Sequence, residues 1–273
     1  MAASTANIST RVSLRWPPEP AFETTDTASL SVGGWYVDLR IERESGKVEW
    51  AMAGQRVVES ESPSIVVFTH AIDSLQLFDT ADIGTFQKLS NGDDLEMGKM
   101  IRHDLPGAPY CEYEELWRSL DIPTSVPKGR GYAWILESEE MLPSITVLGQ
   151  EEYKGAKVVK TFLGRVPGHY IALRQTQWYQ EKQVDGKPAV TKVGGEVSGR
   201  REMWDATTGQ NAAVKYAVGA ECDRLPSLVA AGESLQFSGE GEGLWRSPGR
   251  AVIVDGTKFL VRAFEELPQS RSV

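Results

Sequence analysis

The stretch TASLSVGGWYVDLRIERESGKVEWAMA, residues 27–53, decides the fold class. Apolar and polar residues alternate in three short runs, a pattern typical of half-buried antiparallel strands. Gly33-Gly34 and Ser45-Gly46 separate the runs and favour tight turns between neighbouring strands. The stretch therefore predicts an antiparallel meander with strands at 27–32, 35–43 and 47–53.

The same alternation recurs along the rest of the chain, and helical periodicity is scarce. We expect fewer than about one residue in six in helices. Asn91-Gly92 and Asp255-Gly256 add two hairpin signals. Further strands are predicted at 10–16, 64–72, 84–89, 94–102, 111–118, 131–138, 144–149, 156–163, 169–181, 188–194, 198–205, 212–218, 233–238, 250–255 and 258–265.

The acidic stretch SEEMLPS, residues 138–144, interrupts the strand pattern and predicts a domain boundary near residue 142. The predicted domains are 1–142 and 143–273. Closing each set of strands removes the exposed edges. The predicted fold is all-β, with two tandem antiparallel lipocalin-like β-barrel domains. Because a barrel of about eight strands is either filled by its own side chains or holds one small ligand, the interior decides the function.

Charge and hydropathy exclude several classes of function. The formal net charge is −9, which repels a phosphate backbone, so no nucleic-acid partner is expected. Apolar runs such as SIVVF fall short of the ~20 residues of a membrane span, and the polar start predicts no secretory signal. A cytoplasmic location is expected. Cys111 and Cys222 are then expected to be thiols, since a reducing compartment disfavours disulfides.

The sequence contains no usual cofactor or metal motif. His70, His103 and His169 lack the short spacings of metal ligands, and CxxC and HExxH are absent. The glycine runs near 194 and 239–243 lack the strand-loop-helix setting of a phosphate loop. We expect neither a metal nor a cofactor.

Six segments in order resemble the fungal casein-kinase interactors usually called the Hri family: ISTRVSLRW, GGWYVDLRI, EWAMAG, THAIDS, DLEMGKM and YEELW. The resemblance covers about residues 8–140 and implies two lipocalin-type barrels in tandem. The chain is also similar, in size, in lacking cofactor motifs and in its double-barrel character, to the fungal hetero-Diels–Alderases of tropolonic sesquiterpenoid biosynthesis. That similarity implies a cofactor-independent cyclase, or pericyclase, of secondary metabolism, in which a tropolone-derived quinone methide joins a terpene alkene to form a meroterpenoid.

Strand alternation sorts the candidate site residues onto faces. Trp50 and Met52 share one face of their strand, and Trp134 lies on one face of 132–136; each set either lines a pocket or fills a core. Tyr36, Asp38 and Arg40 share another face. There Tyr36 and Arg40 are candidate hydrogen-bond donors to a ligand, and the alternative is a structural Asp38–Arg40 ion pair.

Two further segments carry candidates. His70 lies beside Phe68 on the face of one predicted strand, as a neutral donor or acceptor in a pocket or as a satisfied core histidine. Arg174 and Trp178 share a face in the second half, either against a planar ligand or in a surface cation–π ladder. The acidic clusters at 112–115 and 137–140 are expected to be mostly solvated, with a raised pKa for any carboxylate that turns inward.

Three functions fit these observations. The first is the cofactor-independent cyclase, with Tyr36, Arg40 and His70 as catalytic donors and with Trp50, Met52, Phe68, Trp134, Arg174 and Trp178 binding the substrates. The second is a non-catalytic carrier of a small apolar or aromatic ligand. The third is a kinase-interacting protein, and a protein partner or a homodimer is also allowed.

Overall fold

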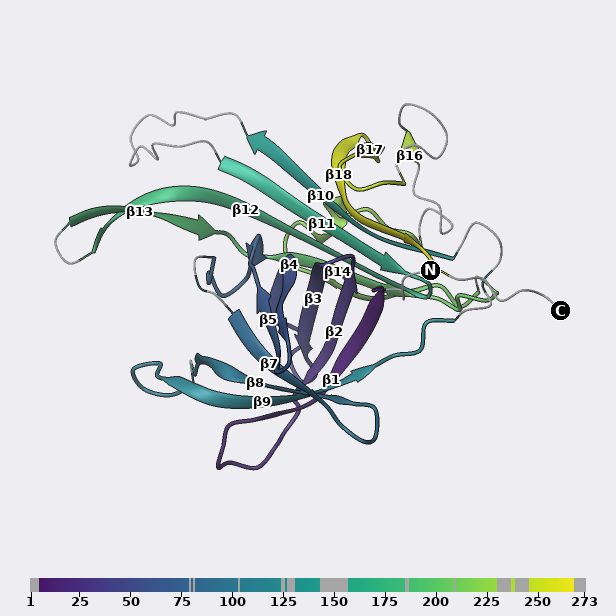
Figure 1. Ribbon diagram of the computed structural model, residues 1–273. Coiled ribbons are helices and arrows are strands. Elements are labelled where there is room, and N and C mark those ends of the chain that lie inside the picture. Colours follow the sequence, from purple (N-terminus) through teal and green to yellow (C-terminus); the bar gives the residue numbers. More distant parts are fainter. Residues whose placement is uncertain are drawn as a thin grey trace.

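The computed structural model describes residues 5–78, 80, 82–102, 104–123, 126, 131–142, 157–184, 187–208, 210–229, 237–238 and 246–267. Its strands form two antiparallel sheets (Figure 1), and apart from the one-turn 3-10 helix η1 (Cys222–Arg224) these residues contain no helix. The predicted all-β, antiparallel class is confirmed.

The first sheet is a closed barrel. Its eight principal strands pair in the order β3-β2-β1-β9-β8-β7-β5-β4, and β4 pairs back to β3; the short β6 pairs with β4. The strands are β1 (Asn7–Arg15), β2 (Thr25–Val32), β3 (Trp35–Glu42), β4 (Val48–Glu61), β5 (Ser64–Phe68), β6 (Ile72–Asp73), β7 (Asp82–Lys88), β8 (Asp94–Ile101) and β9 (Tyr110–Ser119).

The hairpin between β2 and β3 shows why the sequence folds this way. Val32 pairs with Trp35, so Gly33 and Gly34 are the whole loop, and their φ angles are +55° and +79°. Positive φ at both central positions is the two-residue turn whose twist matches the flanking strands, and glycine adopts it without strain. The predicted meander is confirmed.

The second sheet has the strand order β15-β14-β12-β11-β10-β18-β17-β16, and β13 pairs with β12. Within the described residues, β15 and β16 do not pair to close it. Its strands are β10 (Tyr132–Leu142), β11 (Lys157–Val166), β12 (His169–Val184), β13 (Lys187–Gly194), β14 (Ser198–Met203), β15 (Ala213–Val218), β16 (Phe237–Ser238), β17 (Ala251–Val254) and β18 (Thr257–Glu266).

The chain changes sheets between Ser119 and Tyr132, upstream of the boundary expected near residue 142. β10 pairs with β11 and β18, so residues 132–142 belong to the second sheet although they lie before the expected boundary. The predicted strand at 144–149 lies outside the described residues. The division into domains itself stays a prediction.

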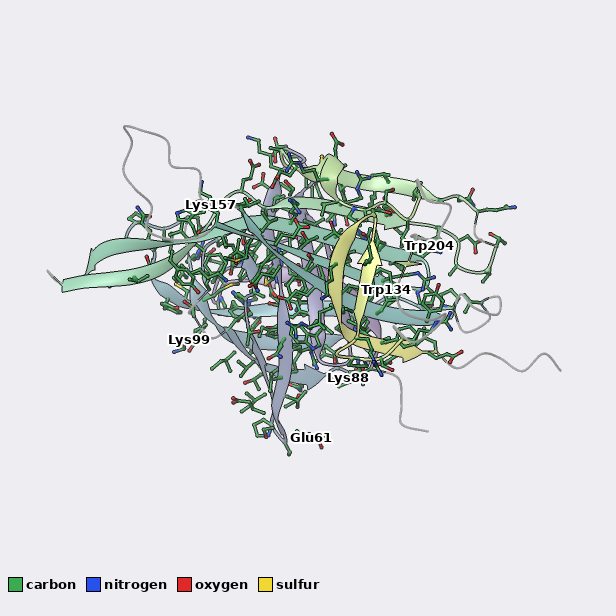
Figure 2. All side chains as sticks on the ribbon, turned by 90° about the horizontal axis from the view of Figure 1, so that it is seen from above. Glu61, Lys88, Lys99, Trp134, Lys157 and Trp204 are labelled. Atoms are coloured by element: carbon green, nitrogen blue, oxygen red, sulfur yellow. The ribbon has the colours of Figure 1, made fainter. Side chains whose placement is uncertain are left out.

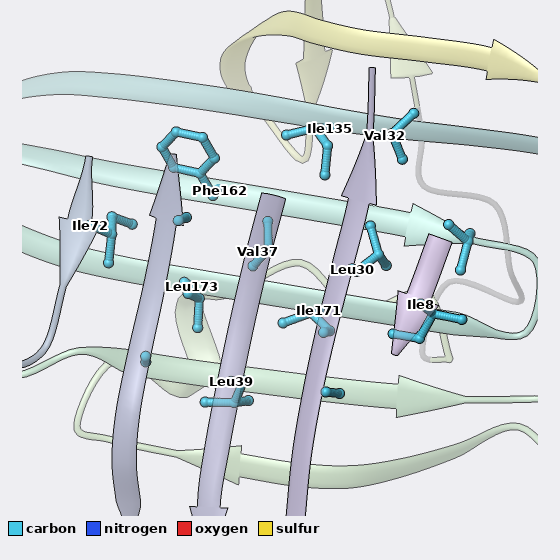
Figure 3. Close-up of a cluster of buried hydrophobic side chains, with 14 of the residues drawn as sticks. Ile8, Leu30, Val32, Val37, Leu39, Ile72, Ile135, Phe162, Ile171 and Leu173 are labelled. Carbon is cyan, nitrogen blue, oxygen red and sulfur yellow. The ribbon is translucent and has the colours of Figure 1, made fainter. Parts of the chain in front are cut away.

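The barrel and the second sheet share a hydrophobic core (Figure 3). Leu30, Val37 and Leu39 on the outer face of β2 and β3 pack against Phe162 and Leu173 of β11 and β12. The inward residues of β3 are therefore buried in the barrel, and its outward residues are buried under the second sheet. One wall of the barrel is thus fixed from both sides.

Candidate functional site

The interior of the closed barrel holds a cavity of about 220 Å³. Its lining alternates along the strands as the period of two requires, because every second side chain of a barrel strand points inward. Eight strands contribute side chains to it: Asn7, Ser9, Ser29, Ser31, Tyr36, Asp38, Arg40, Trp50, Met52, Arg56, Ser64, Phe68, Asp82, Phe86, Asp94, Glu96, Met100, Tyr113, Glu115 and Trp117.

Aromatic rings form much of the wall. Tyr36 and Phe68 meet edge to face with ring centroids 5.3 Å apart, and Phe86 lies 6.3 Å from Phe68. Tyr36, Trp50, Met52 and Phe68, all predicted from the sequence, line this one cavity. The cavity is therefore shaped for a ligand that contacts ring faces.

Arg40 is held in a buried charge cluster. Its Nη1 donates to Oε1 of Glu115 at 3.0 Å and its Nε donates to Oδ1 of Asp38 at 3.3 Å. Its guanidinium carbon lies 4.8 Å from the ring centroid of Trp50 and 5.5 Å from that of Trp117. The Asp38–Arg40 ion pair allowed by the sequence is present. The two hydrogen bonds use Nε and Nη1, and a donation from Arg40 to a ligand stays a prediction.

Glu115 comes from the acidic cluster at 112–115. It is the buried partner of two arginines, because Nη1 of Arg11 also donates to its Oε1 at 2.5 Å. Burial acts to raise the pKa of this carboxyl, but Arg40 and Arg11 outweigh burial and lower it. One carboxylate of the cluster does turn inward; the raised pKa expected for it is wrong, because the sequence could not show the two arginines that face it.

Glu96 is the second buried carboxyl of the cavity. Its two oxygens accept hydrogen bonds from the hydroxyl of Tyr113 at 2.8 Å and from Nε1 of Trp117 at 2.9 Å. Burial, with the negative charges of Glu115 and Asp82, raises the pKa of Glu96 to about 8. At pH 7 the group is therefore mostly a carboxylic acid in the wall of the cavity.

Two glycines make room for this pair. Gly84 and Gly98 are directly opposite on β7 and β8. A Cβ at Gly84 would lie 2.5 Å from Oε1 of Glu96, and one at Gly98 would lie 2.8 Å from the ring of Tyr113. The missing side chains are thus what allows the carboxyl and the phenol to lie inside the barrel.

His70 is buried beside the cavity and is not part of its lining. The predicted strand 64–72 breaks after Phe68, and this break turns His70 toward Asp73, whose Oδ2 lies 2.5 Å from Nδ1. Burial disfavours the imidazolium, but Asp73 and Asp82 outweigh burial and raise the pKa of His70 to about 9. Of the two interpretations of His70, the neutral group in a pocket is wrong, because two carboxylates keep the imidazole charged at neutral pH. The other holds: His70 is a buried histidine with a partner, Asp73.

His70 still acts on the wall through Asp73. Nε1 of Trp50 donates to Oδ1 of Asp73 at 3.1 Å, and the ring of His70 meets that of Trp50 edge to face. His70 therefore helps to position Trp50. The hydroxyl of Tyr36 is likewise engaged, since it donates to the carbonyl oxygen of Thr69 at 3.1 Å.

The other three predicted site residues lie on the second sheet. Trp134 is fully buried in a separate core on the side of that sheet facing away from the barrel, with Trp204 and beside the yellow hairpin in Figure 2. Arg174 donates to Oγ1 of Thr161, and Nζ of Lys157 lies 5.6 Å from the ring centroid of Trp178. They do not join the barrel cavity.

Sequence reasoning missed Glu96, Tyr113, Trp117, Arg56 and Phe86. Tyr113, Glu115 and Trp117 alternate within YCEYEELW, and Glu96 lies in DLEMGKM, so the period of two could have grouped them. What the sequence lacks is the closure that brings β7, β8 and β9 across from β3 and β4.

Neither a metal site nor a membrane helix is seen in the part of the chain that the structure describes. There, no three His, Cys, Asp or Glu side chains gather as metal ligands would. None of the helices described there is long and apolar enough to cross a bilayer.

The fold and the site define a class: an antiparallel β-barrel with a cavity in its interior, backed by a second antiparallel sheet. The family model described as Protein HRI1 matches residues 7–239, most of the chain, so the chain belongs to the HRI1 family. The predicted Hri-type family is confirmed. The link to hetero-Diels–Alderases stays a prediction.

Among solved structures, the crystal structure of the uncharacterized protein YLR301w from Saccharomyces cerevisiae is similar. The TM-score is 0.59 and the sequence identity 13%, and the match covers 95% of this chain and 99% of that chain. At this identity the likeness concerns the fold alone. No curated protein matches the chain.

Proposed function

We propose that the N-terminal barrel binds one small ligand in its cavity. The observation that carries this proposal is the lining of that cavity: aromatic rings together with a buried carboxyl, Glu96, that makes no ion pair among the described residues. Concave sites with ring faces and a few polar groups are the usual form of small-molecule sites.

The volume limits the ligand. About 220 Å³ is below the roughly 300 Å³ at which pockets for drug-sized ligands begin. A single-ring compound of about ten non-hydrogen atoms fits this size. A carrier, or an enzyme that acts on one small substrate, needs nothing larger.

Tryptophan fluorescence tests the proposal, with a panel of single-ring phenols, carboxylates and amines as probes. A bound probe should quench Trp50 and Trp117, which line the cavity, and leave Trp134 unchanged. Trp50→Phe should therefore remove part of the quenching, and the matched Trp134→Phe should not. If no probe changes the fluorescence or the melting temperature, the proposal is wrong.

A cofactor-independent cyclase of the hetero-Diels–Alderase kind is the finer candidate. Glu96 favours it, because a carboxylic acid in an aromatic wall can donate a hydrogen bond to a quinone-methide carbonyl as negative charge develops there. In such a cycloaddition two σ bonds replace two π bonds and nothing leaves. Both partners together exceed about 220 Å³, so this candidate requires the barrel to widen.

The cyclase is tested by incubating a tropolone-derived quinone methide with a humulene-type alkene in the presence of EDTA. Glu96→Gln should slow product formation more than Tyr36→Phe or His70→Phe, because the hydroxyl of Tyr36 is engaged and His70 is outside the lining. Equal rates with and without the protein would exclude this chemistry and leave the binding proposal intact. The kinase-interacting function stays a prediction.

A further inference from the structure

The cavity carries an excess of negative groups. Five of its lining residues are carboxylic acids, Asp38, Asp82, Asp94, Glu96 and Glu115, against two arginines, Arg40 and Arg56. Arg40 is already neutralised by Asp38 and Glu115. The charges that remain for a ligand to meet are therefore mainly acidic.

Two of these acids lack a close basic partner in the cavity. Glu96 accepts hydrogen bonds from the neutral Tyr113 and Trp117 and makes no ion pair with any described residue. Asp82 has Nε2 of His70 at 3.8 Å, behind the wall. They face inward on the neighbouring strands β7 and β8.

Arg56 only partly offsets these acids. Its guanidinium carbon lies 6.0 Å from the ring centroid of Phe86, and it makes no ion pair with a described residue. Burial lowers the pKa of Arg56, although the negative charges of Glu96 and Asp94 act to raise it. Nζ of Lys88 lies 3.0 Å from Oδ2 of Asp94, so Glu96 and Asp82 are the acids left without a close basic partner in the cavity.

The aromatic rings of the cavity already contact a cation of the protein itself. The guanidinium of Arg40 lies between the rings of Trp50 and Trp117, and ring faces attract cations through their quadrupole. Tyr36, Phe68 and Phe86 provide further ring surface in the same cavity. Aromatic rings, together with carboxylates that have no close basic partner in the cavity, are the groups that bind an amine or a quaternary ammonium.

We propose that the ligand of the barrel is a small organic cation, an amine or quaternary ammonium compound of about one ring, whose charge lies beside Glu96 and Asp82. This inference rests on the proposed binding function and names the ligand's class. An anionic ligand would lie beside Asp82 and, above about pH 8, beside the ionised Glu96 as well. A neutral ligand would then leave Glu96 without a counter-charge.

The test uses three probes that share a phenol ring: tyramine, which is a cation, 4-ethylphenol, which is neutral, and 4-hydroxyphenylacetate, which is an anion. We expect tyramine to bind at least about tenfold more tightly than 4-ethylphenol at pH 8.5, and the anion to bind most weakly. Glu96→Gln should remove the preference for tyramine. Glu112→Gln, an exposed glutamate on β9, is the matched control and should keep the preference.

A second variant guards against misfolding. If Glu96→Gln does not fold, Asp82→Asn should reduce the preference for tyramine instead. Binding of the neutral or anionic probe as tightly as tyramine, or loss of the preference in Glu112→Gln, would overturn the cation while leaving a binding barrel. If none of the three probes binds, this inference fails, and the proposed function fails as well only if the whole probe panel described above gives no signal.

The pH dependence gives a further readout. The titratable and charged groups around Glu96 are Tyr113 and Glu115 of β9, Asp82 of β7, Arg40 of β3 and Arg56 of β4. Only the ionised form of Glu96 attracts the cationic probe. The affinity for tyramine should therefore rise between pH 6.5 and 8.5 in the wild type and stay flat in Glu96→Gln. A flat wild-type profile would contradict the placement of the charge beside Glu96.

Discussion

Arg40, predicted as a donor to a ligand, also holds the wall of the cavity together. Its side chain is buried and bonds to Asp38 and Glu115, and it lies between two tryptophans. Removing one partner of a buried ion pair leaves the other charge uncompensated, which costs more than the pair contributes.

Arg40→Met should therefore lower the free energy of unfolding by about 3–5 kcal/mol, because Asp38 and Glu115 lose their shared counter-ion. Urea denaturation measures the change. Arg118→Met is the control: Arg118 pairs with Asp93 but its side chain is 55% exposed, so its loss should cost much less than that of Arg40. Equal costs for the two variants would show that the cluster does not stabilise the barrel.

His70 predicts a pH dependence of stability. Its pKa in the folded protein is about 9 and its ordinary value is 6.5, so the folded state holds a proton that the unfolded chain releases. The stabilisation is complete below about pH 6.5 and is lost as the pH rises through about 9, by up to about 3 kcal/mol. The pKa of Glu96 is raised from its ordinary value of 4.5 to about 8, so this group also makes the protein less stable as the pH rises.

Urea denaturation between pH 6 and 10 checks this expectation. His70→Gln should show a shallower fall over that range than the wild type. His169→Gln is the control, because burial, with Arg201 and Lys215, lowers the pKa of His169 to about 4 and its contribution changes only below pH 6.5. A wild-type stability that is constant from pH 6.5 to 9.5 would contradict the charged His70.

At the scale of strands, alternation predicted faces better than it predicted lengths. The predicted run 35–43 is β3, with Tyr36, Asp38 and Arg40 inside and Leu39 outside, as expected. The predicted run 47–53 is the start of β4, which continues to Glu61 because β5 pairs with it. Pairing between strands extends an element beyond its own pattern.

The site was predictable where neighbours in sequence are neighbours in space. Trp50, Met52 and Tyr36 lie on the adjacent strands β3 and β4. Glu96 was missed because its importance depends on Tyr113, Trp117 and Gly84, which three different strands bring together. Trp134 fills a core, one of the two possibilities that the sequence left open, because an alternating strand with two buried faces does not reveal which face borders a cavity.

Gly84 should be intolerant of even the smallest side chain. In Gly84→Ala the new Cβ would lie 2.5 Å from Oε1 of Glu96, so the carboxyl must move, and the crowding should cost about 1–3 kcal/mol. Tyramine affinity and urea denaturation measure the two effects. Gly195→Ala is the control, since its nearest neighbour would be 3.5 Å away, and an equal effect in both variants would contradict the close approach.

For the whole molecule, the shared core predicts that the barrel and the second sheet unfold together. Leu39 is fully buried and lies between them, so Leu39→Ala should cost about 2–5 kcal/mol. Tryptophan fluorescence and far-UV circular dichroism should report one coincident transition in both proteins.

Val58→Ala provides the comparison for that experiment. Val58 is an exposed residue of β4, so its truncation should change the free energy of unfolding by no more than about 0.5 kcal/mol. Two separate transitions in the wild type would show that the outer wall of the barrel does not depend on the second sheet.

The doubly buried wall also constrains how this chain can change in length. Successive residues of β3 from Tyr36 to Ile41 face charge and hydrocarbon in turn, and all six are buried. Inserting or deleting one residue there would exchange the two sets, placing Asp38 and Arg40 in the hydrocarbon interface and Leu39 among the carboxylates. Length variation among relatives should therefore be confined to turns such as Ser45-Gly46. An extra residue there leaves the charged residues of β3 inside the barrel and its apolar residues under the second sheet.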